Sequence, residues 1–292
     1  MNVIQSSIVC CTLMMGCSPP APPSADKAQV QRIMNDPRYE WVTIETPKTR
    51  IHFPVGSFAQ TKRGSLPAQA EESRSTVLQR LSEADYSNTI DVFYIDNRRD
   101  MESLVGSPVT GFAYFDDDAV VVVFNDTWRA FERHELTHVV TLGTWQSPAE
   151  PAVVEGLATY VDGYCGGYEN GRVVRTILDT GAGIRLETLT GDFRNQDDLV
   201  AYLQASSAID FAVQQLGPQA IRVLWDRGLR AISELLEISL HEYESRFEDW
   251  LASTYDPIPP AAWTAIRDAG CGIRARQATK GAPEHEESHE EV

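Results

Sequence analysis

The most informative segment of the chain reads Phe131-Glu132-Arg133-His134-Glu135-Leu136-Thr137-His138 and contains the pattern HExxH. On a helix, residues four apart lie one turn above each other. His134 and His138 can therefore direct their imidazole nitrogens at one point, as a Zn²⁺ site requires. Glu135 projects beside that point, where a carboxylate can accept a proton from metal-bound water. The segment predicts two metal ligands and a catalytic base.

A second HExxH occurs near the end of the chain, in His285-Glu286-Glu287-Ser288-His289. It has no apolar face and no following helix that could supply a third ligand. We interpret this copy as a coincidence within a Glu- and His-rich tail, with weak metal scavenging as the alternative. The surroundings of the first copy therefore carry the metal-site prediction.

The expected third ligand is Glu155, which sixteen residues separate from His138. It lies in a predicted helix over 151–162, and two antiparallel helices would bring the three ligands together. Gly156 costs helix stability, which close approach of the backbone to a neighbour or a metal would explain. Asp162 lies two turns along the same face, where it can accept the other ring N–H of a ligating His. Taken alone, Glu155 could be a solvated helix carboxylate and Asp162 an ordinary helix-end residue. Together with the two histidines they predict one Zn²⁺.

HELTH followed by VEGLATYVD resembles the gluzincin metallopeptidases, and the best match is the bacterial peptidase-MA-like group. The resemblance spans roughly residues 111–251. It implies a zincin-like fold with the active site between two lobes. It also implies that His134, His138 and Glu155 are zinc ligands, that Glu135 is the catalytic base and that Asp162 supports a ligand from behind. Val154 stands where these enzymes usually have Asn.

The same resemblance implies that Tyr202 donates to the oxyanion that develops during peptide hydrolysis. Tyr160 and Tyr164 are closer in sequence, but we expect them to pack or to face solvent. The strand that begins at Gly111, Phe112 and Ala113 could align an extended peptide by main-chain pairing, although it could also be an ordinary sheet strand. The strand lacks the Glu of the aminopeptidase GxMEN signature, so an aminopeptidase assignment is unsupported.

The order of the segments predicts an α+β protein. A small mixed sheet with helices would occupy residues 36–143 and end in the HExxH helix, and a mainly helical lobe would occupy 144–275. The expected strands are a hairpin over 39–54 with its turn at Pro47-Lys48, and strands over 89–95, 111–115 and 119–124. The expected helices cover 67–82, 99–104, 127–142, 151–162, 197–216, 218–227 and 240–251. Asn125 or Asp126 would cap the HExxH helix and Gly143 would end it.

Residues 1–17 carry no charged side chain and read as a signal peptide whose end, Leu13 to Cys17, resembles a bacterial lipobox. Cys17 would be lipidated, and the Pro/Ala-rich residues 18–35 would form a tether. A plain secretory signal or a start-site artefact are the alternatives. The resulting location is the bacterial cell envelope, with the protein anchored in the membrane by lipid and facing the periplasm or exterior. There Cys165 and Cys271 can form a disulfide, or can both be small buried apolar residues.

The composition fits a soluble globular protein, because 42% of the 292 residues are hydrophobic and 23% are charged. The formal charge of −17 argues against a nucleic-acid partner. Residues 276–292 are acidic and lack a large apolar residue except the final Val, so we expect them to be disordered.

These observations predict a zinc metallopeptidase that hydrolyses peptide or protein substrates with metal-activated water. One alternative is a binding lipoprotein of the envelope without turnover, whether zinc-stabilised or metal-free. Glu135 argues against it, since a structural zinc site has no use for a non-ligand carboxylate beside the metal and usually closes its fourth position with Cys or His. A weaker alternative is a metal-sequestering protein that uses its His/Glu tail. The sequence specifies neither the cleavage preference nor the oligomeric state.

Overall fold

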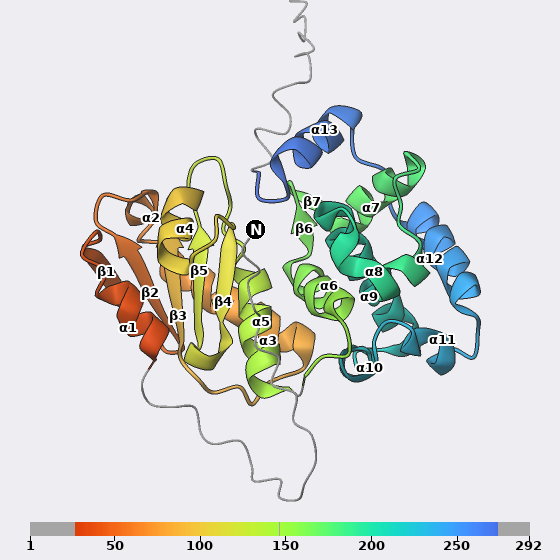
Figure 1. Ribbon diagram of the computed structural model, residues 1–292, viewed down its shortest axis with the longest axis horizontal. Helices are drawn as coiled ribbons and strands as arrows, with labels where there is room; N and C mark the ends of the chain where they lie inside the picture. Colours follow the sequence, from red (N-terminus) through yellow and green to blue (C-terminus); the bar gives the residue numbers. More distant parts are fainter. Residues whose placement is uncertain (1–26, 146, 274–292) are drawn as a thin grey trace, which may run out of the picture.

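The computed structural model describes residues 27–145 and 147–273 (Figure 1). The predicted signal peptide with Cys17, the first part of the predicted tether and the predicted acidic tail lie outside the described residues. No helix in the described ranges combines the length and the apolar character needed to cross a membrane. The described chain is a mixed α+β structure, as predicted.

The main sheet has five strands in the order β1-β2-β3-β5-β4. β1 and β2 form the predicted antiparallel hairpin, β3 runs parallel to β2 and β5, and β4 is an edge strand antiparallel to β5. The strand bounds are β1 Trp41–Glu45, β2 Thr49–Pro54, β3 Ile90–Ile95, β4 Gly111–Tyr114 and β5 Ala119–Val123. The sheet is therefore mixed, as the sequence predicted.

Helices cover both faces of this sheet. Val92 and Tyr94 of β3 face a core shared with α3 (Leu66–Leu81) and α5 (Glu132–Thr144). Phe93 and Ile95 face a second core shared with α1 (Ala28–Met34) and α4 (Arg98–Val105). Burial on both faces explains why β3 and β5 are apolar at nearly every position. The predicted tether over residues 18–35 was too long, because α1 occupies its last part and buries Val30 and Ile33 in the second core.

The HExxH helix α5 begins later than predicted. Residues 127–131 are not helical, because the Asn125 side chain accepts the backbone N–H groups of Thr127 and Trp128 in a turn instead of capping a helix. Trp128 then pairs with Ile273 in an antiparallel bridge. The helix also continues through Gly143 to Thr144. α5 packs on β4 and β5 on one side and on α6 on the other, so it joins the sheet to the helices that follow (Figure 1).

The chain after α5 is mainly helical. α6 (Pro151–Asp162) ends at Gly163 as predicted, and it packs along α9 (Asp198–Leu216). A Cβ on Gly156 would lie 2.8 Å from the Cβ of Ala205 in α9, so the predicted close approach is to a neighbouring helix. The other helices are α2 Phe58–Thr61, α7 Asn170–Asp179, α8 Leu186–Asp192, α10 Ala220–Arg227, α11 Ala231–Leu235, α12 Leu240–Thr254 and α13 Pro260–Ala269. A short hairpin, β6 (Tyr164–Cys165) and β7 (Tyr168–Glu169), follows α6 and was not predicted.

The segment after α13 returns to the start of α5. Cys271 forms a disulfide with Cys165, so the pairing left open by the sequence is made. The carbonyl of Cys271 also accepts the backbone N–H of Gly166, and the carbonyl of Gly272 accepts that of Arg129. Covalent and main-chain bonds therefore hold this segment between the β6–β7 hairpin and the residues that precede α5.

Candidate metal centre

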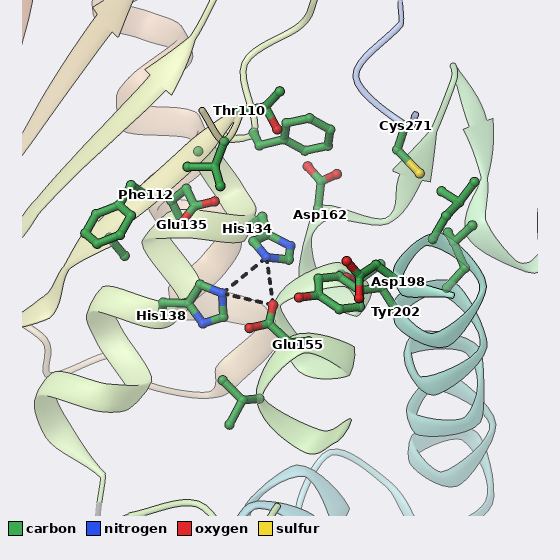
Figure 2. A pocket seen from close by; sticks show the side chains of 18 of the residues that line it. Thr110, Phe112, His134, Glu135, His138, Glu155, Asp162, Asp198, Tyr202 and Cys271 are labelled. Atoms are coloured by element: carbon green, nitrogen blue, oxygen red, sulfur yellow. Dashed lines mark hydrogen bonds and ion pairs between the residues drawn. The ribbon is translucent and has the colours of Figure 1, made fainter. Parts of the chain in front are cut away.

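Three side chains from two helices meet at one point, as predicted. The Nε2 atoms of His134 and His138 are 3.2 Å apart. The Oε2 atom of Glu155, on α6, lies 3.3 Å from the first and 3.5 Å from the second (Figure 2). In the described part of the chain this is the one group of three His, Cys, Asp or Glu residues whose ligand atoms converge within 4.8 Å.

The spacing of these three atoms fits a tetrahedral zinc ion. With Zn–N and Zn–O bonds of about 2.0–2.1 Å, two ligands of a tetrahedral ion are roughly 3.3–3.4 Å apart. The three observed distances, 3.2, 3.3 and 3.5 Å, bracket that range. Two imidazoles and one carboxylate are also a donor set that zinc accepts in catalytic sites. The residues present therefore fit one zinc ion with a fourth position left for another ligand.

The charge state of Glu155 suits a ligand. Burial alone would raise the pKa of its carboxyl group, but the hydrogen bonds and charges of His134 and His138 outweigh burial and hold the pKa well below its ordinary value. Glu155 is therefore ionised at neutral pH, as a metal ligand must be.

Glu135 lies beside the three converging side chains and is only 8% exposed (Figure 2). Its carboxylate packs against the backbone of the edge strand β4, because a Cβ built on Gly111 would lie 2.7 Å from the Glu135 carboxyl carbon. Burial raises the pKa of Glu135 to about 7, with the charges of Glu155 and Asp162 adding to the rise and that of His138 opposing it. A carboxyl group with a pKa near neutrality can both accept and return a proton at physiological pH.

Asp162 makes a different contact from the one expected. Its two oxygens bind the guanidinium of Arg129, which also donates to the carbonyl of Tyr164. No hydrogen bond between Asp162 and a ligating imidazole is present in the described residues, and Nδ1 of His138 is buried without a partner among them. The bidentate geometry of the guanidinium explains the preference for Arg129. Asp162 therefore ties the end of α6 to the segment before α5.

Tyr202, on α9, lies beside the ring of His134. The two rings are nearly parallel, with an angle of 5° between their planes and centroids 6.4 Å apart. Figure 2 shows the Tyr202 hydroxyl directed toward Glu155 and the imidazoles. Burial, together with the charges of Glu155, Asp198 and Glu135, raises the pKa of this phenol well above its ordinary value, so it remains a hydrogen-bond donor at neutral pH.

One cavity of about 680 Å³ is lined by His134, Glu135, His138, Glu155, Asp162 and Tyr202. One wall is the edge strand β4, with Gly111, Phe112 and Ala113 at the predicted positions. The other walls come from α5, α6 and the first turns of α9, and Cys271 lies at the rim (Figure 2). The cavity thus combines the three converging donors, a buried carboxyl group, a phenol and a strand edge.

Two supporting residues escaped the sequence analysis. Glu132, in the first turn of α5, is buried and accepts hydrogen bonds from Tyr94, Ser73 and Gln69. No sequence signal pointed to Glu132, because the predicted helix began at residue 127 and the partners of Glu132 lie 38 to 63 residues away. Arg129 gave no signal, because its partner Asp162 lies 33 residues away.

No protein-family model and no curated protein matches this sequence.

Proposed function

We propose that this protein is a zinc-dependent metallopeptidase of the gluzincin type that hydrolyses peptide bonds in peptide or protein substrates. The proposal includes a zincin-like arrangement in which the active site lies between the sheet and the helices that begin with α6. The observation that carries it is the convergence of His134, His138 and Glu155 at distances suited to one zinc ion, with Glu135 buried beside them.

The chemistry follows from the groups around the cavity. A zinc ion held by these three ligands would lower the pKa of a water molecule and polarise a substrate carbonyl. Glu135, whose pKa is about 7, would accept a proton on its carboxylate and return it to the leaving nitrogen. Gly111 leaves the room that this carboxylate occupies.

Two further elements would hold the substrate. The outer edge of β4 makes no ladder with another described strand, so its main-chain groups can pair with an extended peptide. The Tyr202 hydroxyl would donate a hydrogen bond to the oxygen of the scissile carbonyl as negative charge develops there. Its raised pKa supports this role, because the phenol keeps its proton.

We also propose that the protein is a lipoprotein of the bacterial cell envelope, attached through Cys17. The lipobox-like sequence supports this location, and so does the disulfide between Cys165 and Cys271, because disulfides persist in oxidising compartments.

The decisive experiment compares purified wild-type protein with Glu135→Gln on a casein-like substrate and a mixed peptide library. We expect about one zinc per chain in both proteins, hydrolysis by the wild type, and a loss of kcat of at least about 10²-fold in the variant. Glu102→Gln removes an exposed carboxylate on α4 and should leave both zinc and activity unchanged. Wild-type protein that holds zinc and cleaves nothing in the library would favour the non-catalytic binding protein.

A further inference from the structure

The cavity that contains the metal centre extends along α5 beside the edge strand β4, and these two elements run in the same direction. The start of β4 lies beside the start of α5, because a Cβ on Gly111 would lie 2.8 Å from Cγ of Glu135. The residue after β4, Phe115, lies beside the end of α5, because its carbonyl oxygen would lie 3.5 Å from a Cβ on Gly143. A peptide paired antiparallel with β4 would therefore point its C-terminal side toward the start of α5.

Arg98, the first residue of α4, lies at this end of the cavity. It is the single Lys or Arg among the described residues that line the cavity. Its guanidinium lies 4.9 Å from the centre of the Trp128 ring. A Cβ on Gly272 would overlap the rings of both Trp128 and Phe131, so these two rings lie next to each other. Phe131 immediately precedes α5 and lines the cavity, which places Arg98 where α5 begins.

The guanidinium of Arg98 is available for a ligand. The side chain is exposed, and among the described residues it makes no ion pair and no hydrogen bond. Trp128, which it contacts, is held by a hydrogen bond from its backbone N–H to the Asn125 side chain and by its bridge to Ile273. A cation–π contact uses no hydrogen-bond acceptor, so the N–H donors of Arg98 can bind a carboxylate, in the bidentate geometry that arginine favours.

The other charged groups of the cavity have different roles. The carboxyl groups of the metal centre take part in the proposed chemistry, and Asp162 binds the guanidinium of Arg129. Asp198 is the remaining carboxylate in the described lining and lies on the α9 wall (Figure 2). Outside the metal centre, Arg98 is thus the cationic group of this lining that a substrate can reach.

We propose that Arg98 is a specificity-determining residue that binds a carboxylate of the substrate on the C-terminal side of the cleaved bond. The carboxylate is either the side chain of an Asp or Glu residue or the free C-terminus of the peptide. This inference rests on the proposed peptidase function, but the binding step can be measured without turnover.

Four peptides test the proposal. They are acetyl-Ala-Ala-Phe-Ala-Glu-Ala-amide, its analogues with Gln or Lys in place of Glu, and the Gln peptide with a free C-terminal carboxylate. Calorimetry measures their binding to the Glu135→Gln protein in the presence of zinc, so that turnover does not interfere. We expect at least one carboxylate peptide to bind about 5-fold more tightly than the amidated Gln peptide, since an exposed ion pair contributes modestly. Added salt should weaken this preference.

Variants at Arg98 assign the preference to this side chain. Arg98→Gln, added to Glu135→Gln, should abolish it. Arg99→Gln is the matched control, because Arg99 is an exposed arginine on the same helix that does not line the cavity. Arg98→Glu should reverse the preference, so that the Lys peptide binds more tightly than the Glu peptide. A structural role of Arg98 would not produce this reversal.

Cleavage by the protein with an intact Glu135 gives the remaining readouts. The values of kcat/KM should follow the order of the affinities, and mass spectrometry should place the Glu after the cleaved bond. Tighter binding of the Glu peptide assigns the site to an acidic side chain, and tighter binding of the free C-terminus assigns it to a chain end. The proposal is overturned if neither carboxylate peptide is preferred, if the preference survives in Arg98→Gln, or if the Glu lies before the cleaved bond. A preference that depends on Arg98 without any cleavage would support the carboxylate site and count against the peptidase function.

Discussion

Gly111 should control the position of the catalytic carboxylate, and Gly111→Ala tests this. The backbone of Gly111 does not lie in the left-handed region, so alanine can adopt its conformation without strain. The new Cβ would lie 2.7 Å from the Glu135 carboxyl carbon and 2.8 Å from its Cγ, whereas ordinary contacts begin near 3.4 Å. The Oε1 atom of Glu135 would lie closer still, so the carboxylate must withdraw by more than about 0.7 Å or rotate away.

Such a shift of the Glu135 carboxylate should lower the catalytic rate and leave the metal ligands in place. A misplacement of about 1 Å at a reacting group can reduce a rate by about 10²-fold, which corresponds to about 2.7 kcal/mol of transition-state stabilisation. His134, His138 and Glu155 keep their positions, so the zinc content should not change. We expect the loss to appear in kcat with KM nearly unchanged, because Gly111 contributes only backbone to the strand that would hold the substrate.

The assay measures kcat and KM on the best substrate from the peptide library, together with zinc content by atomic emission. Gly191→Ala is the matched control, since a Cβ at that position has no neighbour within 4 Å and the backbone is not left-handed. A Gly111→Ala protein with wild-type kcat, or one that loses its zinc, would contradict this role of Gly111.

Three further outcomes are expected. Burial raises the pKa of Asp91, but hydrogen bonds from His52, Arg50 and Lys27 outweigh burial and lower the pKa from 3.8 to about 2. The ion pairs of Asp91 therefore stabilise the fold above pH 3.8, and this stabilisation is lost as the pH falls to about 2. Urea unfolding should show that Asp91→Asn costs at most about 2 kcal/mol at pH 7 and progressively less below pH 4, and an equal cost at pH 7 and pH 2 would contradict the assignment. Tyr202→Phe should reduce kcat by about 10²-fold with zinc retained, and an unchanged kcat would remove the proposed hydrogen-bond donor. Replacement of both half-cystines of the disulfide by serine should lower the free energy of unfolding by about 2–5 kcal/mol, because the bond closes a loop of 106 residues; a loss below 1 kcal/mol in denaturant unfolding would argue against this constraint.

The sequence predicted those parts of the molecule that depend on local patterns. The hairpin of β1 and β2 followed from alternating side chains, and α6 followed from Pro151 at its start and Gly163 at its end. The convergence of His134, His138 and Glu155 was predictable because a helical spacing of four fixes two ligands and a short connection brings the third helix close.

The parts that the sequence did not predict depend on tertiary contacts. The first turn of the predicted HExxH helix is lost because the Asn125 side chain holds Thr127 and Trp128 in a turn. Trp128 and Arg129 also bond to the chain near residue 272, more than a hundred residues later. For the same reason Asp162 was assigned to an imidazole, whereas the structure pairs it with Arg129. The contact between Gly111 and Glu135 joins a strand to a helix, and no sequence spacing signals it.

Anomalous diffraction at the zinc absorption edge would show whether one zinc ion binds His134 Nε2, His138 Nε2 and Glu155 Oε2. This metal site predicts one strong anomalous peak per chain within about 2.0–2.2 Å of these three atoms, lost in Glu155→Ala and retained in His289→Ala. A peak located elsewhere, or zinc content that depends on His289 instead of Glu155, would contradict it.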